Sequence, residues 1–256
     1  MKADNIFCRW FPTWFTPDWE TCTLASLWNG NNAQQRMMNM LSPTMSDGKF
    51  KDYLNWQKQR GCDTVHLILS NELDGECAGF CIYGSSVDWT VDKNIVNKML
   101  DRIKKCRREG LGVVLWLMTD DSGNYNKLIL SDPQRYLNDL EKLGLLKCAS
   151  IICLGLELSE YVRTDSQMKA LTEATRKVWK GQIATHDISN SLKFAGYGDI
   201  VFGQVSPSTS DSAMLRFASI VKSTGKPCGI IEHWRSPNRD RCQKLRAEGL
   251  PFVGNW

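Results

Sequence analysis

The sequence repeats one unit along its length: an amphipathic helical segment, a glycine that ends it, and a short apolar segment. Val91–Glu109 carries apolar residues at helical spacing, Gly110 follows it, and Gly112–Met118 has the composition of a buried strand. Glycine ends a helix at little cost because it accepts a left-handed backbone. The repeat predicts eight strands: Thr23–Gly30, Cys62–Leu69, Gly112–Met118, Ser150–Glu157, Gln182–Asp187, Asp199–Val205, Cys228–Trp234 and Pro251–Trp256.

The helices between these strands have their own boundary signals. Ser131-Asp132-Pro133 provides an N-cap followed by proline in the first turn, so the third helix is expected from there to about Leu143. The other helices are expected to end at glycines, namely Gly61, Gly110, Gly181, Gly198, Gly225 and Gly249.

Strands that alternate with single helices imply parallel pairing through right-handed crossovers. An open doubly wound sheet is the competing architecture, but it rarely needs eight consecutive units and usually carries a phosphate-binding loop. Neither GxGxxG nor GxxxxGKS/T occurs here, so no nucleotide cofactor is expected. We predict an α/β protein with one (β/α)8 barrel domain over residues 1–256, in which an aromatic-rich N-terminal segment (about 1–20) packs beside the last strand.

Composition narrows the class of protein. A length of 256 residues suits one barrel, and a net charge of +4, with only short basic clusters, does not indicate nucleic-acid binding. No apolar run approaches the roughly 18 residues that cross a membrane, and the first five residues lack the layout of a signal peptide. Most of the ten cysteines lie in apolar segments, which favours free thiols and synthesis in a reducing cytoplasm.

Polar and aromatic residues follow the predicted strands at the ends where parallel barrels place their reactive groups. Polarity that merely resumes after a buried strand explains one or two carboxylates, but less easily a ring of them. The candidate residues are Trp28, Asn29, Asn71, Asp120, Glu157, Glu160, His186, Asp187, Gln204, Glu232, His233, Trp234 and Trp256.

Two glutamates end apolar strands. Alternation along Ile151–Glu157 puts Glu157 on the same face as Cys153 and Gly155, whose small side chains leave room in a barrel interior. Burying a carboxylate costs several kcal/mol unless it is paired or protonated, so Glu157 is either functional or paired with a neighbouring Arg or Lys. Cys228–Glu232 is a second apolar run that ends in a carboxylate. Strands four and seven lie on opposite sides of the ring, so the two glutamates could face each other across the mouth of the barrel. Glycoside hydrolysis requires such a pair, with one protonated acid and one ionised nucleophile or base.

Sugars also require aromatic platforms and amide hydrogen-bonding groups. Trp28, Trp89, Tyr125, Trp234 and Trp256 are expected in strand-end or loop positions, and Asn29, Asn31, Asn32, Asn71 and Gln204 supply amides. His186 could orient an acid or bind a hydroxyl, whereas His66 is expected to be a core histidine. Neither Asp120-Asp121 nor the Cys77/Cys81 pair has the partners that a metal site requires, so no metal is expected.

The layout resembles the retaining glycoside hydrolases of clan A. The resemblance implies that Glu157, at the end of strand four, is the acid/base, that Glu232, at the end of strand seven, is the nucleophile, and that Trp256 lies under the bound sugar. The clan usually has Asn directly before the strand-four glutamate, and here that residue is Leu156. Glu160 is the alternative acid.

The chain also looks like the compact glycosidase-like barrels of tailed bacteriophages, a resemblance that implies virion association and virion partners. Three functions follow from the sequence. The first is a glycoside hydrolase acting on a poly- or oligosaccharide. The second is a non-catalytic carbohydrate-binding or structural barrel, which Leu156 favours. The third is a barrel enzyme of another class, such as a lyase or isomerase.

Overall fold

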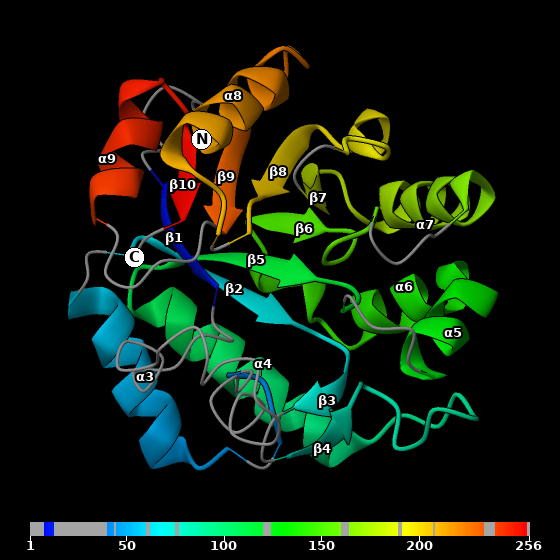
Figure 1. The fold of residues 1–256 in the computed structure, drawn as a ribbon. Helices are drawn as coiled ribbons and strands as arrows, with labels where there is room; N and C mark the ends of the chain where they lie inside the picture. The colour runs from blue at the N-terminus through cyan, green and yellow to red at the C-terminus, as the bar shows by residue number, and fades with distance from the viewer. Residues whose placement is uncertain are drawn as a thin grey trace.

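The computed structural model describes residues 8–12, 40–43, 45–59, 62–74, 77–119, 124–159, 164–188, 191–206, 208–232 and 239–254. Seven parallel strands form a curled sheet in chain order (Figure 1). They are β2 (Thr64–Ile68), β5 (Gly112–Trp116), β6 (Ile151–Cys153), β7 (Gln182–Ile188), β8 (Ile200–Gln204), β9 (Cys228–Glu232) and β10 (Phe252–Gly254). The backbone of β1 (Cys8–Pro12) pairs in parallel with β10 on one side and β2 on the other.

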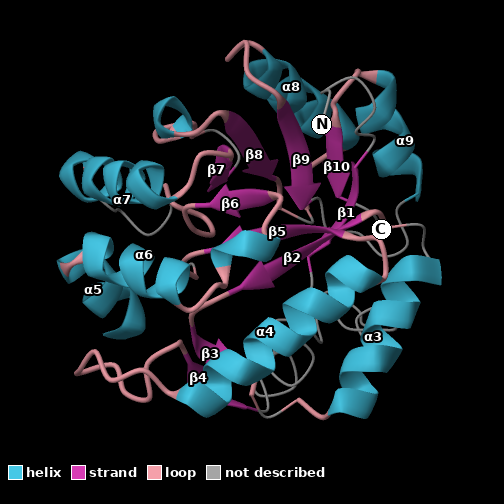
Figure 2. Ribbon diagram, turned by 180° about the vertical axis from the view of Figure 1, so that it is seen from behind, coloured by secondary structure: helices cyan, strands magenta, loops and turns pink. Residues whose placement is uncertain are grey.

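Helices surround the outside of this curled sheet (Figure 2). They are α3 (Asp47–Gln59), α4 (Lys93–Arg108), α5 (Asn124–Ser131), α6 (Pro133–Lys142), α7 (Asp165–Val178), α8 (Asp211–Lys222) and α9 (Arg239–Ala247). Short 3-10 turns η3 (Leu146–Cys148) and η4 (Ala195–Tyr197) lie in two connections, and β3 (Asn71–Asp74) and β4 (Cys77–Phe80) form an antiparallel hairpin after β2. The whole is a helix-covered parallel sheet of the kind found in barrel proteins.

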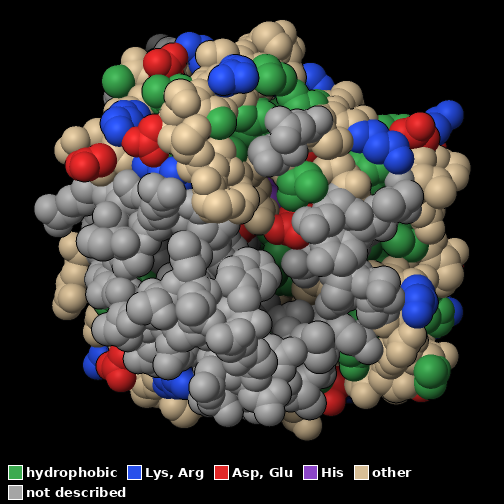
Figure 3. Space-filling model, viewed as in Figure 1, with side chains coloured by type: hydrophobic (Ala, Val, Ile, Leu, Met, Phe, Trp, Pro, Cys, Tyr) green, Lys and Arg blue, Asp and Glu red, His purple; other side chains and the backbone are tan. Residues whose placement is uncertain are grey.

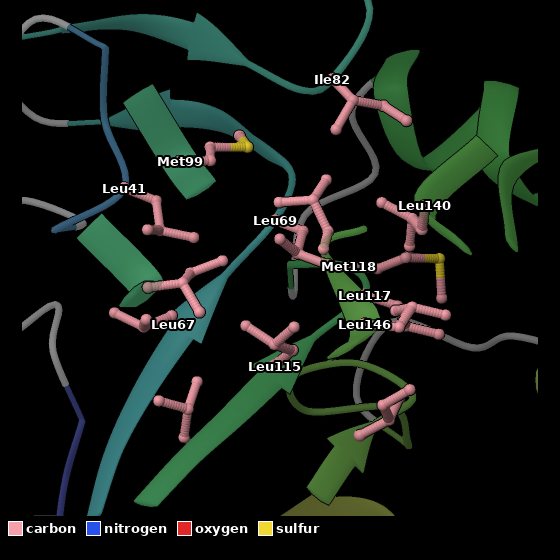
Figure 4. Close-up of a cluster of buried hydrophobic side chains, with 14 of the residues drawn as sticks. Leu41, Leu67, Leu69, Ile82, Met99, Leu115, Leu117, Met118, Leu140 and Leu146 are labelled. Atoms are coloured by element: carbon pink, nitrogen blue, oxygen red, sulfur yellow. The ribbon is translucent and has the colours of Figure 1, made fainter. Parts of the chain in front are cut away.

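Alternation along the strands divides the core into two layers. Outward side chains such as Leu67 and Leu115 pack with Met99 of α4 beneath the helices (Figure 4). Inward side chains form a separate cluster inside the curl, which includes Trp116, Cys153, Phe202, Ile231 and Phe252. The inner cluster is the floor on which any site at the carboxyl ends of the strands would rest.

The predicted helix boundaries are confirmed in part. Gly110, Gly225 and Gly249 have positive φ, as expected for glycines that end helices, and Asp132 caps α6 by accepting the Arg135 N–H at 3.0 Å. Gly181 and Gly198 were expected to act likewise, but neither has positive φ. The reason is that α7 already ends at Val178, and that Gly198 follows only the short turn η4.

Two other predictions need correction. The predicted strand Thr23–Gly30 lies outside the described residues, and the strand found between β10 and β2 is β1, within the N-terminal segment expected only to cover the end. The fourth strand was predicted to reach Glu157, but β6 ends at Cys153. Tyr125, expected in a loop, lies in α5.

The cysteines placed in the structure agree with the expectation of free thiols: Cys62, Cys81, Cys106, Cys148, Cys153, Cys228 and Cys242 form no disulfide. Within the described part of the chain, no helix combines the length and apolar character needed to cross a membrane.

Candidate active site

Glu232 is the last residue of β9, and its side chain is buried. The pairing of β8 with β9 shifts at this point: Gly203 pairs with Ile230, but Gln204 pairs with Glu232. Ile231 is therefore an extra residue on β9, which is a β-bulge. Ile230 packs in the outer layer and Ile231 in the inner cluster, as alternation requires. The bulge then lets Glu232 also face the interior, where alternation alone would turn it toward the helices.

His186 of β7 lies beside Glu232 inside the curl. Its Nε2 is 3.8 Å from the Glu232 Oε1, and its ring meets Trp116 edge-on with the ring centroids 5.1 Å apart. The other ring nitrogen, Nδ1, accepts the backbone N–H of Glu157 at 2.9 Å. One imidazole therefore bridges the backbone that carries Glu157 and the carboxylate of Glu232.

Glu157 lies four residues beyond β6, in a turn rather than on the strand. Backbone hydrogen bonds hold the turn from both sides, with Leu156 N–H donating to Met118 O at 3.2 Å and Leu158 N–H donating to His186 O at 3.0 Å. Glu157 has a φ of 44°, and it is the only described residue other than glycine with a positive φ. Such backbone conformations cluster at active sites because the surrounding structure has to enforce them.

The predicted face of the fourth strand is also wrong beyond Cys153. Leu156 packs in the inner cluster, and a Cβ on Gly155 would meet Met118 and Leu158 of the outer layer. The change in facing occurs because the strand ends at Cys153, so that alternation no longer applies. Glu157 reaches this region through its turn and not through strand alternation.

Burial keeps both described histidines neutral. It lowers the pKa of His186 to about 3, and burial together with the nearby His186 holds the pKa of His66 well below its usual value. His66 Nδ1 accepts the Trp116 Nε1–H at 2.9 Å, so the prediction of a core histidine is confirmed. His186 likewise has no exposed surface, which suits the first of its two predicted roles, orienting an acid, better than the second, direct contact with a sugar hydroxyl.

Two further candidate residues lie on β7 and β8. Gln204, the last residue of β8, is half-buried and lies in register with Glu232 on the neighbouring strand. Asp187 follows His186 on β7 and is fully buried. Burial raises the pKa of Asp187 to about 6, although the nearby Ser159 and the backbone of Phe194 favour its ionised form.

Several predicted site residues lie outside the described part of the chain: Trp28, Asn29, Asp120, Glu160, His233, Trp234 and Trp256. Asn71 begins β3, and its side chain is not described. Trp89 is not an open platform, because the Arg135 guanidinium lies 4.9 Å from the centre of its ring and its ring meets that of Tyr83 edge-on. Among the described residues, no group of three or more His, Cys, Asp or Glu side chains could hold a metal ion.

In the space-filling view, acidic side chains gather at a hollow near the middle of one face (Figure 3). The sequence analysis named both glutamates and His186 as candidates, but it did not predict the bulge that turns Glu232 inward or the position of the imidazole between the two glutamates. The only sequence signal for that link is the position of His186 at the end of an apolar strand.

The sequence matches no protein-family model and no curated protein sequence. Solved structures with a similar fold include glycoside hydrolases. A GH113 β-1,4-mannanase aligns at a TM-score of 0.54 and 16% identity, over 80% of this chain and 81% of that one. A family 5 glycoside hydrolase from Bacteroides vulgatus ATCC 8482 aligns at a TM-score of 0.62 and 14% identity, over 85% of this chain and 57% of that one. A β-glycosidase from Pyrococcus horikoshii aligns at a TM-score of 0.57 and 10% identity, over 81% of this chain and 74% of that one. At these identities the likeness establishes the fold alone.

Proposed function

We propose that this protein is a glycoside hydrolase that cleaves a poly- or oligosaccharide, with Glu157 as acid/base and Glu232 as nucleophile. The observation that carries the proposal is the position of His186, which accepts the backbone N–H of Glu157 and lies 3.8 Å from the Glu232 carboxylate. The glycoside hydrolases with a similar fold support the same reading. Asn71, Gln204 and the predicted strand-end residues outside the described part are proposed to contact sugar.

The proposed reaction needs the two carboxyl groups in different protonation states. Glu157 donates a proton to the glycosidic oxygen as the bond to the anomeric carbon breaks, and the ionised Glu232 bonds to that carbon. A water molecule then bonds to the anomeric carbon while Glu157 takes its proton, and the bond between that carbon and Glu232 breaks to release the sugar. This retaining course expects carboxyl groups about 5–5.5 Å apart, and an inverting one about 6.5–9.5 Å.

The test is release of reducing ends from a panel of β-1,4-mannan, β-glucan, xylan, chitin and peptidoglycan. We expect hydrolysis of at least one, and a fall in kcat/KM of about 10²-fold or more in Glu157→Gln and in Glu232→Gln. Glu173→Gln is the matched control, since its side chain is 62% exposed on α7. Full turnover by Glu232→Gln would remove it as the nucleophile.

Azide separates the two roles. In Glu232→Ala, azide can attack the anomeric carbon directly, which inverts its configuration. In Glu157→Ala, azide attacks the glycosyl-enzyme, which retains it. If Glu232→Ala gave the retained azide product and Glu157→Ala the inverted one, Glu157 would be the nucleophile and Glu232 the acid/base.

We also propose that β1 completes an eight-stranded (β/α)8 barrel. The parallel pairing of Cys8–Pro12 with both edge strands supports this. Deletion of residues 1–12 should then expose the edges of β2 and β10 and abolish cooperative thermal unfolding. A shortened chain that unfolds like the whole one would exclude β1 from the barrel.

A non-catalytic carbohydrate-binding barrel, for example in a virion, is the alternative. It is favoured by the buried Leu156, which stands where the resembled clan carries a sugar-binding Asn. A glycan array tests it: binding by wild type and Glu232→Gln alike, without release of reducing ends, would support the alternative.

A further inference from the structure

His186 makes polar contacts on both sides of its ring inside an otherwise apolar cluster. Trp116 meets the ring edge-on, Phe202 and Ile231 belong to the same inner cluster as Trp116, and the His186 side chain has no exposed surface. A polar group buried there is costly unless its hydrogen-bonding capacity is used. Nδ1 uses that capacity on the Glu157 backbone N–H, while Nε2 makes no hydrogen bond and has Glu232 Oε1 3.8 Å away.

The geometry determines the tautomer of the neutral ring. Nδ1 accepts the Glu157 N–H, so it cannot carry a proton, and the single ring proton must lie on Nε2. That proton is available toward Glu232 Oε1, 3.8 Å away. A separation of 3.8 Å is too long for a hydrogen bond, but catalytic hydrogen bonds are often long in unliganded sites and shorten when substrate binds.

We propose that His186 is a positioning residue that acts on both glutamates: its Nδ1 holds the turn that carries Glu157, and its Nε2–H orients the Glu232 carboxylate when substrate binds. The inference rests on the proposed glycosidase function and deepens it. It also explains why Glu157 keeps its left-handed backbone, since the N–H of that residue is held by the ring and the next N–H by the carbonyl of the same His186.

Two nearly isosteric variants separate the two contacts. In His186→Asn, the amide oxygen can take the place of Nδ1 while the donor toward Glu232 is lost. In His186→Gln, the amide nitrogen can take the place of Nε2 while the acceptor for the Glu157 N–H is lost. Thermal unfolding of both variants checks that they fold.

The activity readout is the pH profile of kcat/KM on the glycan hydrolysed in the panel, with β-1,4-mannan tried first. His186→Asn should move the acidic limb up by about one pH unit, because the Glu232 carboxylate loses a donor that favours its ionised form. His186→Gln should leave the limb in place and lower kcat about tenfold, because the Glu157 turn is loosened. The proposal would be overturned if both variants kept the pH profile and the kcat of the wild type. It would also be overturned if both variants lost the same amount of activity in proportion to their loss of thermal stability.

A spectroscopic readout does not depend on turnover. In wild-type protein labelled with ¹⁵N-histidine, and with the His186 signals assigned from His186→Asn, we expect an unprotonated Nδ1 and a protonated Nε2 from pH 5 to 8. Protonation at Nδ1, or titration in that range, would overturn the proposed arrangement. If no glycan is hydrolysed but the expected tautomer is found, the glycosidase function fails while the two-sided use of His186 stands.

Discussion

Glu157 has a φ of 44°, a region that amino acids with a Cβ avoid because Cβ approaches the neighbouring backbone. The cost is of the order of 1 kcal/mol, and the hydrogen bonds around the turn offset it. A strained backbone at a proposed acid/base suggests that the position was retained for its carboxylate and not for stability.

Replacing Glu157 tests that idea. Because glycine accepts positive φ freely, Glu157→Gly should be about 1 kcal/mol more stable than Glu157→Ala, the reverse of the usual order. Urea unfolding of the two variants measures the difference, and both should be inactive. An alanine variant more stable than the glycine variant would contradict a left-handed residue here.

The raised pKa of Asp187 predicts that folding stability changes with pH in the opposite direction to that expected for a carboxyl group whose pKa is lowered by folding. Its folded pKa is about 6, above the usual 3.8, so the folded state holds the proton more tightly and stability falls as pH rises through about 6. Asp187→Asn should therefore be more stable than wild type by about 1–3 kcal/mol at pH 8, and the gain should shrink toward pH 4. Urea unfolding across that range measures it.

Asp199→Asn is the control for this prediction. Burial alone would raise the pKa of Asp199, but its ion pair with Arg176 and its backbone hydrogen bond from Ile183 leave the pKa lowered. Its stabilising effect is present at neutral pH and is lost as pH falls, so this variant should be less stable than wild type at pH 8. Two variants that shift stability in the same direction would refute the argument from burial.

At the scale of elements, local signals predicted the strands well. β5, β7, β8 and β9 begin within a residue of their predicted starts, because an apolar run after a helix stop is read from neighbouring residues. The bulge in β9 could not be read this way, since it exists only in the pairing with β8. β1 was not predicted as a strand either, because it contains Pro12 and, within the described part, no helix precedes it. The hairpin of β3 and β4 was also not predicted.

Arg102 ties α4 to the segment before α3. Its buried guanidinium donates to the Met40 carbonyl at 2.8 Å and also to the carbonyls of Ser42 and Met45. Arg102→Met should lower the free energy of unfolding by about 2–5 kcal/mol, because buried carbonyls lose charged donors. Arg108→Met, from a side chain 63% exposed on the same helix, should stay within about 0.5 kcal/mol of wild type. Equal effects of both substitutions in urea unfolding would contradict this role.

For the whole molecule, the strand–helix repeat was sufficient to predict a curled parallel sheet, and the similar solved structures support that fold. For the site, the sequence predicted a set of strand-end residues and a pair of glutamates across the ring, but not the contacts that these residues make. Which of them meet depends on turns such as that of Glu157 and on contacts between distant strands, as with His186 and Glu232. Neither is encoded in local periodicity.

Close approach of β9 and β10 predicts one sharp intolerance. A Cβ on Gly254 would overlap the backbone carbonyl of Ile231. Gly254→Ala should therefore cost about 3 kcal/mol or more, since backbone cannot move aside as a side chain can. Gly48→Ala in α3, where a Cβ meets only Ser46 Oγ at 4.0 Å, should be neutral or stabilising by about 0.5–1 kcal/mol. Thermal unfolding compares them, and a Gly254→Ala protein as stable as wild type would show that the two strands are not so close.

The facing of Glu232 depends on its pairing with Gln204 of β8 more than on the identity of the residues before it in β9. Ile230 could become Val, or Cys228 Ala, with modest loss of packing, and Glu232 would still face His186. Removing Ile231 would remove the bulge and leave Ile230 opposite Gly203 and Glu232 opposite Gln204, so regular alternation would still turn the carboxylate inward, with loss of the Ile231 side chain from the inner cluster. A one-residue gap at this point in an alignment of homologues would therefore mark loss of the bulge and not loss of the carboxylate from the interior.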